Sequence, residues 1–533
     1  MAGCVVTHQP LAAEAGAEVL RRGGNAVDAA VATAFVQTVV DPQMAGIAGL
    51  GVMTLYLTST GDGHLVDFYE RAPLAATPGM YEALEDQPVA GGLYLVKDFS
   101  NQMGYLAVSA PGTLLGLFEA LTRYGTISWA DAIAPAAALA EEGFPVHEDL
   151  YRYWTRAPRA GDVDNVKKLT ATPECARVYL KDGRFLQPGE RMVLPDYART
   201  LRRIVAEGPD VFYRGEIAAA IDADFRQHGG LLSLEDLRQY RVMHADPLVG
   251  HYRGHVIITN DPPGSGGTVL ETLNILEHFD LAGIGHNSTE YIHTLAQAAA
   301  LAFQDRAVAW GDPRFETIPL NRLLSPEHTR ELVARVRAGG AVAGTLEPAP
   351  EDTTHLSVID AKGNAVALTH TLGTSAGVVT PGLGFLYNNG MHRFWPKPGS
   401  RNSVAPGKSR VSSLSPTVVL QQDRVAFVTG ASGGYGIVSG VVQSILNFVD
   451  HKMSAIEAVA APRIHCEGPV LQLEARIPRQ VARDLERRGH KVQHTSRSYD
   501  QFAGVVAAIG RSEAGRVLGG ADPRRGGTAC YTD

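Results

Sequence analysis

The chain has 533 residues, 45% of them hydrophobic and 20% charged, so it can build a packed core and is not a disordered sequence. Its formal net charge is −8 and no dense Lys/Arg block occurs, which argues against a nucleic-acid partner. No stretch approaches about 18 uninterrupted apolar residues, and no signal peptide is visible, so we expect a cytoplasmic protein outside the membrane. The four cysteines are scattered, as in a reducing compartment.

The N-terminal part of the chain shows mostly helical patterns. A helix over 11–22 is expected to end at Gly23 and Gly24, and Asn25 can cap a second helix over 26–40. Two strand-like runs around a Gly-Asp-Gly turn then predict a hairpin. Further helices are predicted over 113–124, 129–142, within 188–240, and over 268–278, 289–310 and 326–338, with a short strand at 255–261.

Beyond residue 352 the chain changes character. "THLSVID" and "AVALTHTL" flank the turn "AKGN" and predict one hairpin, "SPTVVLQQDRVAFVTG" predicts a second, and a helix follows over 436–450. The small, acidic, Pro/Gly-rich stretch "GGAVAGTLEPAPED" separates the two parts and is typical of a loop or linker. Antiparallel hairpins beside segregated helices favour α+β layers over a βαβ winding.

Two local motifs are weak candidates for metal or phosphate sites. "HYRGH" spaces His251 and His255 as a zinc-binding helix would, but the glutamate of H-E-x-x-H is missing and Gly254 favours a strand. "PPGSGG" (262–267) lacks the lysine of a phosphate loop. We interpret it as a tight turn from strand to helix that can border a pocket.

The stretch "GASGG" (430–434) matches G-x-S-x-G between a strand-like and a helical run. This context is typical of a nucleophile elbow and makes Ser432 a candidate hydrolase serine. The triad partners would follow in chain order: Asp450, then His465 or His490. The flanking sequence lacks the parallel βαβ units of that fold, so the alternative is that Gly433 and Gly434 act through their backbone N–H groups.

Thr353 stands where the acidic run ending at Asp352 meets a strand. An N-terminal threonine can be a nucleophile whose own α-amine is the base, provided that the bond before it is first cut. Strand alternation would put Thr353, His355 and Ser357 on one face and Leu356 on the other. On spacing alone, an ordinary loop-to-strand junction, where threonine is common, is the favoured interpretation.

Many ordered stretches resemble the γ-glutamyltransferase family of N-terminal-nucleophile hydrolases, nearly end to end. They include "GGNAVDAAVA", "DPPGSGGTVLETLNILE", "TTHLSVIDAKGNAVALTHTLGTS", "LYNNGM", "SSLSPTVV", "VTGASGG" and "GGADPR". The resemblance implies an α+β fold, a four-layer αββα sandwich, made as a precursor that cuts itself at Asp352–Thr353. Residues 1–352 would form the large chain and residues 353–533 the small chain, together one folded unit.

The resemblance also implies catalytic roles. Thr353 would be the nucleophile and, through its released amine, the general base. Thr371 in "LTHTL" matches the supporting hydroxyl beside the nucleophile. Gly433 and Gly434 match the backbone oxyanion hole, which speaks against Ser432 as nucleophile. The serines that contact the carboxylate of the acyl donor are matched by Ser412 and Ser413.

The part of the site that would hold the remaining donor groups departs from the family pattern. In "FYERAP", Tyr69 stands where the family has its donor-binding arginine, and Arg71 follows two residues later. Gly373 replaces an asparagine after "T-x-T-L".

A second departure follows "NN" in "LYNNGM". Gly390 replaces a glutamate or glutamine after Asn389, and Arg393 replaces the aspartate that accepts the donor's α-ammonium. Because an acceptor for a cation has become a cation, we expect an acyl group without a free α-amino group and with an anion that Arg393 pairs. The expected substrate-binding residues are Ser412, Ser413, Arg393, Asn389, Tyr69 and Arg71.

The predicted protein is thus an autoprocessed, γ-glutamyltransferase-like threonine enzyme that cleaves a γ-glutamyl-type or related N-acyl amide. Its acyl-threonine intermediate would pass the acyl group to water or an amine. Alternatives are an acylase on glutaryl-cephalosporin or oxamate-type amides, a Ser432 hydrolase, and an uncleaved, non-catalytic relative. We expect no cofactor or metal, and a small-molecule amide as substrate. The two cleaved chains would form a heterodimer, and two heterodimers could associate into a dimer.

Overall fold

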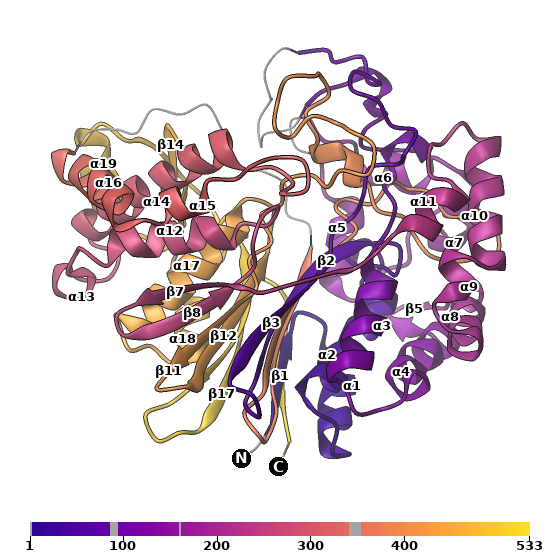
Figure 1. The fold of residues 1–533 in the computed structure, drawn as a ribbon, viewed down its shortest axis with the longest axis horizontal. Coiled ribbons are helices and arrows are strands. Elements are labelled where there is room, and N and C mark those ends of the chain that lie inside the picture. The colour runs from indigo at the N-terminus through magenta and orange to yellow at the C-terminus, as the bar shows by residue number, and fades with distance from the viewer. Residues whose placement is uncertain (1–2, 86–93, 159–160, 340–352, 533) are drawn as a thin grey trace.

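The computed structural model describes residues 3–85, 94–158, 161–339 and 353–532. Two large sheets pack face to face, and helices cover the outer side of each, so the layers run helix, sheet, sheet, helix (Figure 1). The predicted α+β, four-layer αββα architecture is therefore confirmed. Asp352 and the acidic run before it lie outside the described residues.

The first sheet has seven strands and joins both parts of the chain. Its inner strands β9 and β10 form the first predicted hairpin after residue 352, and β1 from the N-terminus pairs with β9. All its pairings are antiparallel. In spatial order the strands are β18 (Thr528–Tyr531), β1 (Cys4–Thr7), β9 (Thr354–Ile359), β10 (Ala365–Thr371), β2 (Leu50–Leu57), β3 (Asp62–Phe68) and β6 (Met243–Ala245).

The second sheet has six strands, also antiparallel, with the predicted β11–β12 hairpin at its centre. In order they are β17 (Val517–Ala521), β16 (Val505–Arg511), β12 (Arg424–Ser432), β11 (Thr417–Gln421), β8 (His255–Thr259) and β7 (Leu248–Tyr252). Smaller sheets are β13 (Ile464–Cys466) with β14 (Val470–Leu473) and β15 (Lys491–His494), and β4 (Phe144–Pro145) with β5 (Arg191–Met192).

The helices over the first sheet come from the N-terminal half of the chain. Asn25 caps α2 through a capping box with Asp28, as its position before an alanine-rich run predicts. This layer contains α1 (Pro10–Arg21), α2 (Ala26–Val40), α3 (Thr113–Tyr124), α4 (Trp129–Glu142), α5 (Glu148–Thr155), α6 (Asn165–Leu169), α7 (Pro173–Tyr179), α8 (Pro195–Glu207), α9 (Asp210–Tyr213), α10 (Glu216–Gln227) and α11 (Leu234–Gln239).

The helices over the second sheet come from two separate stretches of sequence. They are α12 (Gly266–Leu276), α13 (Leu281–Ile284), α14 (Thr289–Ala309), α15 (Leu320–Leu323), α16 (Pro326–Ala338), α17 (Gly436–Val449), α18 (Ala455–Ala460) and α19 (Arg479–Arg487). Short 3-10 turns are η2 (Lys97–Phe99), η3 (Tyr105–Ala107) and η4 (Gly390–Arg393). The α12 helix begins two residues before the predicted start, because Gly266 and Gly267 of the "PPGSGG" turn already belong to it.

A third apolar core lies between the two sheets. Val6 and Ile359 from the first sheet meet Val418 and Ile509 from the second, all with almost no exposed surface. Since successive side chains alternate across a sheet, the same strands send Leu356 to the outer core beneath the helices. The ends of β9, β10 and β12 are thereby held close together, where Thr353 lies.

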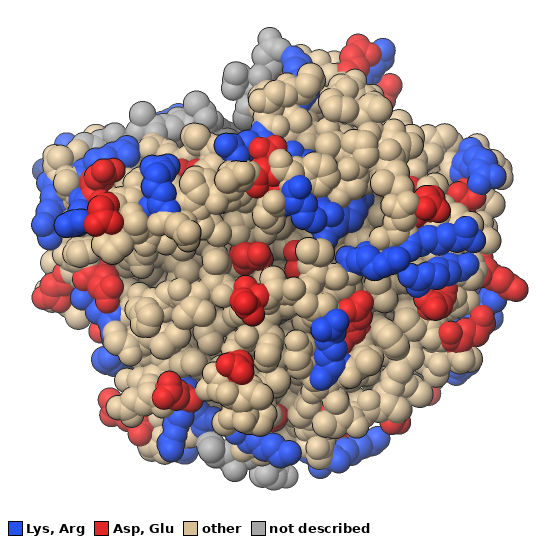
Figure 2. All heavy atoms as spheres, viewed as in Figure 1, with Lys and Arg blue, Asp and Glu red and all other residues tan. Residues whose placement is uncertain are grey.

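The surface carries charges of both signs. On the face in Figure 2, lysines and arginines are interspersed with acidic residues, so this face has no continuous field of one sign. Within the described ranges, no helix is long and apolar enough to cross a bilayer.

Candidate active site

Thr353 lies directly before β9 and is buried, with 5% of its surface exposed. Its φ is +99°, a region that β-branched residues rarely adopt. The predicted alternation holds beyond it: Ser357 donates to the Ala507 carbonyl of the opposite sheet, whereas Thr354 meets Gln37 of α2 on the helix side. Thr353 therefore stands at the end of a rigid strand with strained backbone, a combination that is concentrated at functional sites.

Thr371 lies beside Thr353 across the β9–β10 pair. The register pairs His370 with Thr354, so the next position in each strand brings Thr371 opposite Thr353. The Thr371 hydroxyl accepts a hydrogen bond from the Gly373 N–H at 2.8 Å, which fixes its orientation. Both threonines line the same small pocket, so the structure brings together the two hydroxyls expected from the resemblance.

Gly433 and Gly434 follow the end of β12 and precede α17. Their φ values, +122° and +57°, are conformations that glycine adopts without strain. No backbone acceptor among the described residues takes up either N–H. These donors stand near the positive N-terminal end of α17, an arrangement suited to an oxyanion next to Thr353.

A pocket of about 50 Å³ opens on one side of Thr353. By the same measure a water molecule needs about 10–15 Å³, so the pocket suits a short acyl group. It gathers most of the predicted substrate-binding residues. The predicted residues among its lining are Thr353, Thr371, Asn389, Arg393, Ser412, Ser413 and Gly434.

The small pocket is cationic. Arg393 and Arg410 line it, and among its described lining residues there is no carboxylate. The Arg393 guanidinium lies 5.3 Å from the centroid of the Tyr435 ring, which forms part of the wall. Behind the wall, Nζ of Lys168 bonds Thr374. The chemistry of the pocket is therefore that of an anion acceptor.

The electrostatics of neighbouring groups agree with this assignment. Burial and the adjacent Arg393 and Lys168 lower the pKa of His392, which lines the pocket, well below its usual value. Nε of Arg410 pairs with Oε1 of Glu70 at 2.9 Å, outside the pocket lining. Burial raises the pKa of Glu70, and Arg410 opposes that rise. Arg393 is thus the pocket cation that sequence comparison could identify, whereas Arg410 has no sequence signal of its own.

The serine segment is held from behind by the "PPGSGG" turn. Ser265 donates to the Ser412 carbonyl at 2.8 Å, and the Ser412 N–H donates to Pro263. Arg306 of α14 donates to Ser265 Oγ at 2.8 Å and lies 3.4 Å from Ser413 Oγ. The predicted turn from strand to helix is confirmed, but its residues support the serine segment from behind and are not among the lining of the small pocket. Sequence reasoning missed Arg306 because its partners are distant in the chain.

Two of the six predicted substrate-binding residues, Tyr69 and Arg71, do not line the small pocket. Tyr69 is buried behind the serine segment, where its hydroxyl contacts Asn260. Arg71 bonds Ser409 and lines a separate pocket with Tyr240. The Arg71 guanidinium is held in that separate pocket by its hydrogen bond to Ser409 and by the Tyr240 ring, whose centroid lies 5.9 Å from it.

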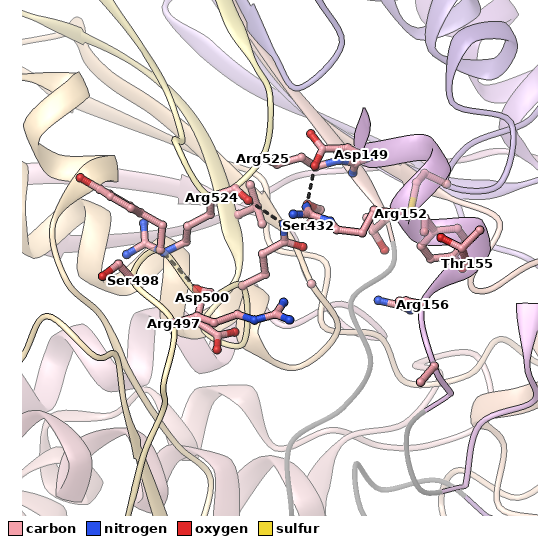
Figure 3. Close-up of a pocket in the computed structure, with 18 of the residues that line it drawn as sticks. Asp149, Arg152, Thr155, Arg156, Ser432, Arg497, Ser498, Asp500, Arg524 and Arg525 are labelled. Atoms are coloured by element: carbon pink, nitrogen blue, oxygen red, sulfur yellow. Dashed lines mark hydrogen bonds and ion pairs between the residues drawn. The ribbon is translucent and has the colours of Figure 1, made fainter. Parts of the chain in front are cut away.

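A much larger cleft, about 680 Å³, opens on the other side of Thr353 and Gly433. Arg152, Thr155 and Arg156 belong to α5 and the residue after it, and Arg497, Ser498 and Asp500 come from a C-terminal loop (Figure 3). Many of its arginines meet carboxylates: Arg152 pairs with Asp149 at 2.5 Å, and Arg525 pairs with Asp41. No sequence motif indicated this cleft.

The Ser432 alternative lacks an assembled triad within the described residues. Ser432 ends β12 and is paired with Val505 in an antiparallel sheet, not the parallel sheet of a nucleophile elbow. The proposed partners bond elsewhere: Asp450 to Tyr252, His465 to Ser439 and Glu467, and His490 to His293.

The zinc spacing of "HYRGH" also has a structural explanation. His251 lies on β7 and His255 on β8, where they belong to the two arms of one hairpin. The expectation that this stretch is strand and not helix is confirmed.

Comparison with known proteins agrees with this geometry. The Gamma-glutamyltranspeptidase family profile matches residues 12–532. The Acylase ACY 1 proenzyme of Pseudomonas sp. (strain V22) is 41% identical over 532 residues, 99% of this chain and 93% of that protein. The Glutathione hydrolase proenzyme of Bacillus subtilis (strain 168) is 34% identical over 552 residues, covering 99% and 91%.

A solved structure is similar over almost the whole fold. The cephalosporin acylase from Bacillus halodurans superposes with a TM-score of 0.87 at 30% identity, over 99% of this chain and 95% of that one. Family profile, relatives and architecture agree from end to end. The chain is an enzyme that belongs to the gamma-glutamyltranspeptidase family of N-terminal-nucleophile hydrolases.

Proposed function

We propose that this enzyme is an acylase that removes a short, anionic acyl group from an amide, with Thr353 as nucleophile. The observation that carries the proposal is the charge of the small pocket: Arg393 and Arg410 line it, and its described lining residues include no carboxylate. A γ-glutamyl group carries an α-ammonium, which this pocket would repel. A dicarboxylic acyl group such as glutaryl has the same chain length and only the negative charge.

The mechanism begins with the release of Thr353. Cleavage of the Asp352–Thr353 bond would free the α-amine of Thr353, and the strained φ of +99° supports this as the scissile position. The names of the two relatives, both proenzymes, also support processing into two chains that stay together.

In each turnover, Thr353 Oγ attacks the amide carbonyl and its proton passes to the α-amine. The carbonyl oxygen becomes an oxyanion that the N–H groups of Gly433 and Gly434 stabilise. When the C–N bond breaks, the amine leaves with that proton. Water then attacks the acyl-threonine ester and loses a proton to the α-amine, which passes it to Thr353 Oγ as the acyl C–Oγ bond breaks and the acid departs.

The gamma-glutamyl alternative keeps one point of support, since the glutathione hydrolase of Bacillus subtilis is 34% identical. The Pseudomonas acylase is more similar in sequence, at 41% identity, and the acylase structure from Bacillus halodurans superposes with a TM-score of 0.87 at 30% identity. Together with the cationic pocket, this favours an acyl group without an α-ammonium.

Three p-nitroanilides of equal chain length test the proposal: glutaryl, γ-glutamyl and valeryl. The valeryl compound replaces the terminal carboxylate by a methyl group, and the γ-glutamyl compound adds the α-ammonium. We expect kcat/KM for glutaryl to exceed both others by roughly 10² or more, the size of a lost or opposed buried ion pair. Preference for the γ-glutamyl compound would contradict the proposal.

A further inference from the structure

Outside the active site, one cluster of side chains has the composition of a metal centre. Glu271 of α12, Asp305 of α14 and His328 of α16 point their donor atoms into one place, with all of these atoms within 4.8 Å of one another. The three residues come from three helices that pack on each other over the second sheet (Figure 1). The cluster is thus made by tertiary packing and not by one acidic stretch.

The donor atoms of the three residues are almost as far apart as the ligands of one metal ion. His328 Nε2 lies 2.6 Å from Asp305 Oδ2 and 3.4 Å from Glu271 Oε1. Donors at about 2.0–2.2 Å from a tetrahedral ion are about 3.3–3.6 Å apart. Movements of about 1 Å, within the reach of side-chain rotation, would convert the cluster into three ligands of one ion.

Glu271 is the independent sign that a ligand belongs here. It is 1% exposed, and neither of its carboxylate oxygens has a well-formed hydrogen bond within the described residues. A buried acceptor without a donor is costly, and a bound cation would supply the missing partner.

The surroundings of His328 also match a metal ligand. Its Nδ1 lies 3.6 Å from Oε2 of Glu331, one turn along α16, so the ring can present Nε2 to the cluster while Nδ1 faces a carboxylate. Histidines that bind metals commonly have such an outer carboxylate, which fixes the tautomer and ring orientation. The two inner carboxylates, Glu271 and Asp305, would balance the charge of a divalent ion.

We propose that Glu271, Asp305 and His328 form a binding site for a divalent transition-metal ion, of which Zn²⁺ is the best match to one imidazole and two carboxylates. The ion would tie α12, α14 and α16 together. The site is structural and separate from Thr353, but Asp305 is followed by Arg306, which donates to Ser265 behind the serine segment. The ion would therefore stabilise the wall of the small pocket without taking part in the reaction.

The test uses the full, tag-free protein, stripped with EDTA and dialysed, and Zn²⁺ alone as the probe. Calorimetric titration and metal analysis are expected to give one Zn²⁺ per molecule, and thermal unfolding is expected to shift upward by several degrees. Glu271→Gln keeps the side-chain volume but removes the charge, and should weaken Zn²⁺ binding by about 100-fold and abolish the shift. Glu327→Gln, an exposed glutamate of α16 next to His328, is the matched control and should behave as wild type.

Two comparisons keep the outcome decisive. If Glu271→Gln fails to fold, Asp305→Asn, whose side chain is 26% exposed, takes its place. If wild type takes up no Zn²⁺, or if the Glu271 or Asp305 variant binds it as tightly as wild type, the proposal is wrong and the cluster is only a histidine–carboxylate hydrogen-bond network. The site is supported if wild type and the Glu327 control bind Zn²⁺ and the Glu271 or Asp305 variant does not.

Discussion

The small pocket and the large cleft, which meet at Thr353, differ in both size and charge. The small pocket, about 50 Å³, is built at the ends of rigid strands; its described lining holds Arg393 and Arg410 and no carboxylate, and Arg410 pairs with Glu70 behind that lining. The large cleft, about 680 Å³, lies between α5 and C-terminal loops, and Arg152 and Arg525 there meet acidic partners. The comparison suggests that one side selects the acyl group by charge and shape, while the other tolerates varied leaving groups.

The largest effect is expected from removing the Thr353 hydroxyl, because Thr353 lines both the pocket and the cleft. Thr353→Ala should leave one chain of full length on a denaturing gel and reduce amide hydrolysis by roughly 10⁶, as for other lost nucleophiles. Ser432→Ala is the control, and it should remain processed and active. A single chain in wild type as well would favour the non-catalytic alternative, and an inactive Ser432→Ala with normal processing would revive the serine alternative.

A smaller but selective effect is expected in the small pocket. Arg393→Asp should lower kcat/KM for glutaryl-p-nitroanilide by about 10²–10³, because an attraction inside the pocket becomes a repulsion. The same variant should improve the γ-glutamyl compound relative to glutaryl. Arg393→Lys preserves the charge and should keep the wild-type order of substrates. If Arg393→Asp keeps the wild-type preference between the glutaryl and γ-glutamyl compounds, Arg393 does not determine which acyl group is bound.

The large cleft should respond weakly and only to charged leaving groups. Arg152→Gln removes a cation that is 52% exposed and already paired with Asp149. Hydrolysis of glutaryl-p-nitroanilide should change by less than about 3-fold, and that of glutaryl-4-aminobenzoate should fall by no more than about 5-fold. A decrease in kcat/KM as large as that of Arg393→Asp would contradict the proposed difference between the small pocket and the large cleft.

The smallest predicted effect concerns stability and pH around β10. Burial lowers the pKa of His8 and of His370 to about 3, far below the ordinary value near 6.5. Below pH 6.5 the unfolded chain binds these protons and the folded chain does not, so stability is complete above that pH and decreases as pH falls. The melting temperature should therefore drop by a few degrees between pH 7 and pH 5.

His370→Gln provides the control for this pH effect. Nε2 of His370 meets Oε1 of Gln37 at 2.8 Å, a contact that a glutamine amide can replace without titrating. The variant should show a shallower decrease in melting temperature between pH 7 and pH 5. A slope equal to that of wild type would mean that His370 is not one of the groups responsible.

Local sequence signals predicted many elements accurately because their causes are local. The helices α3, α4 and α16 have the predicted bounds: Ser128 and Ser325 cap the last two through their side chains, and all three have apolar residues at helical spacing. The β9–β10 hairpin and the alternation of His355 and Leu356 also follow from period-2 patterning around a turn. The site residues Thr371, Gly434 and Arg393 were found because whole motifs of a known family surround them.

Other features depend on which segments meet, and no local pattern reports that. Arg71 and Arg393 both looked suitable for the substrate, yet only Arg393 lines the pocket. Arg410 and Arg306 lie at or behind the pocket wall because β12, α14 and the serine segment converge, and the large cleft exists only because α5 lies opposite a C-terminal loop.

The sequence by itself therefore determined the layers, the strand that begins after Thr353 and the family, since these rest on short-range patterning and on matched motifs. Only the tertiary structure decided which cations line the pocket together with Arg393, how the cleft arginines pair, and that Glu271, Asp305 and His328 converge. The physical reason is that electrostatic and ligand environments are set by distances in space, which packing of the two sheets and their helices creates between residues far apart in the chain.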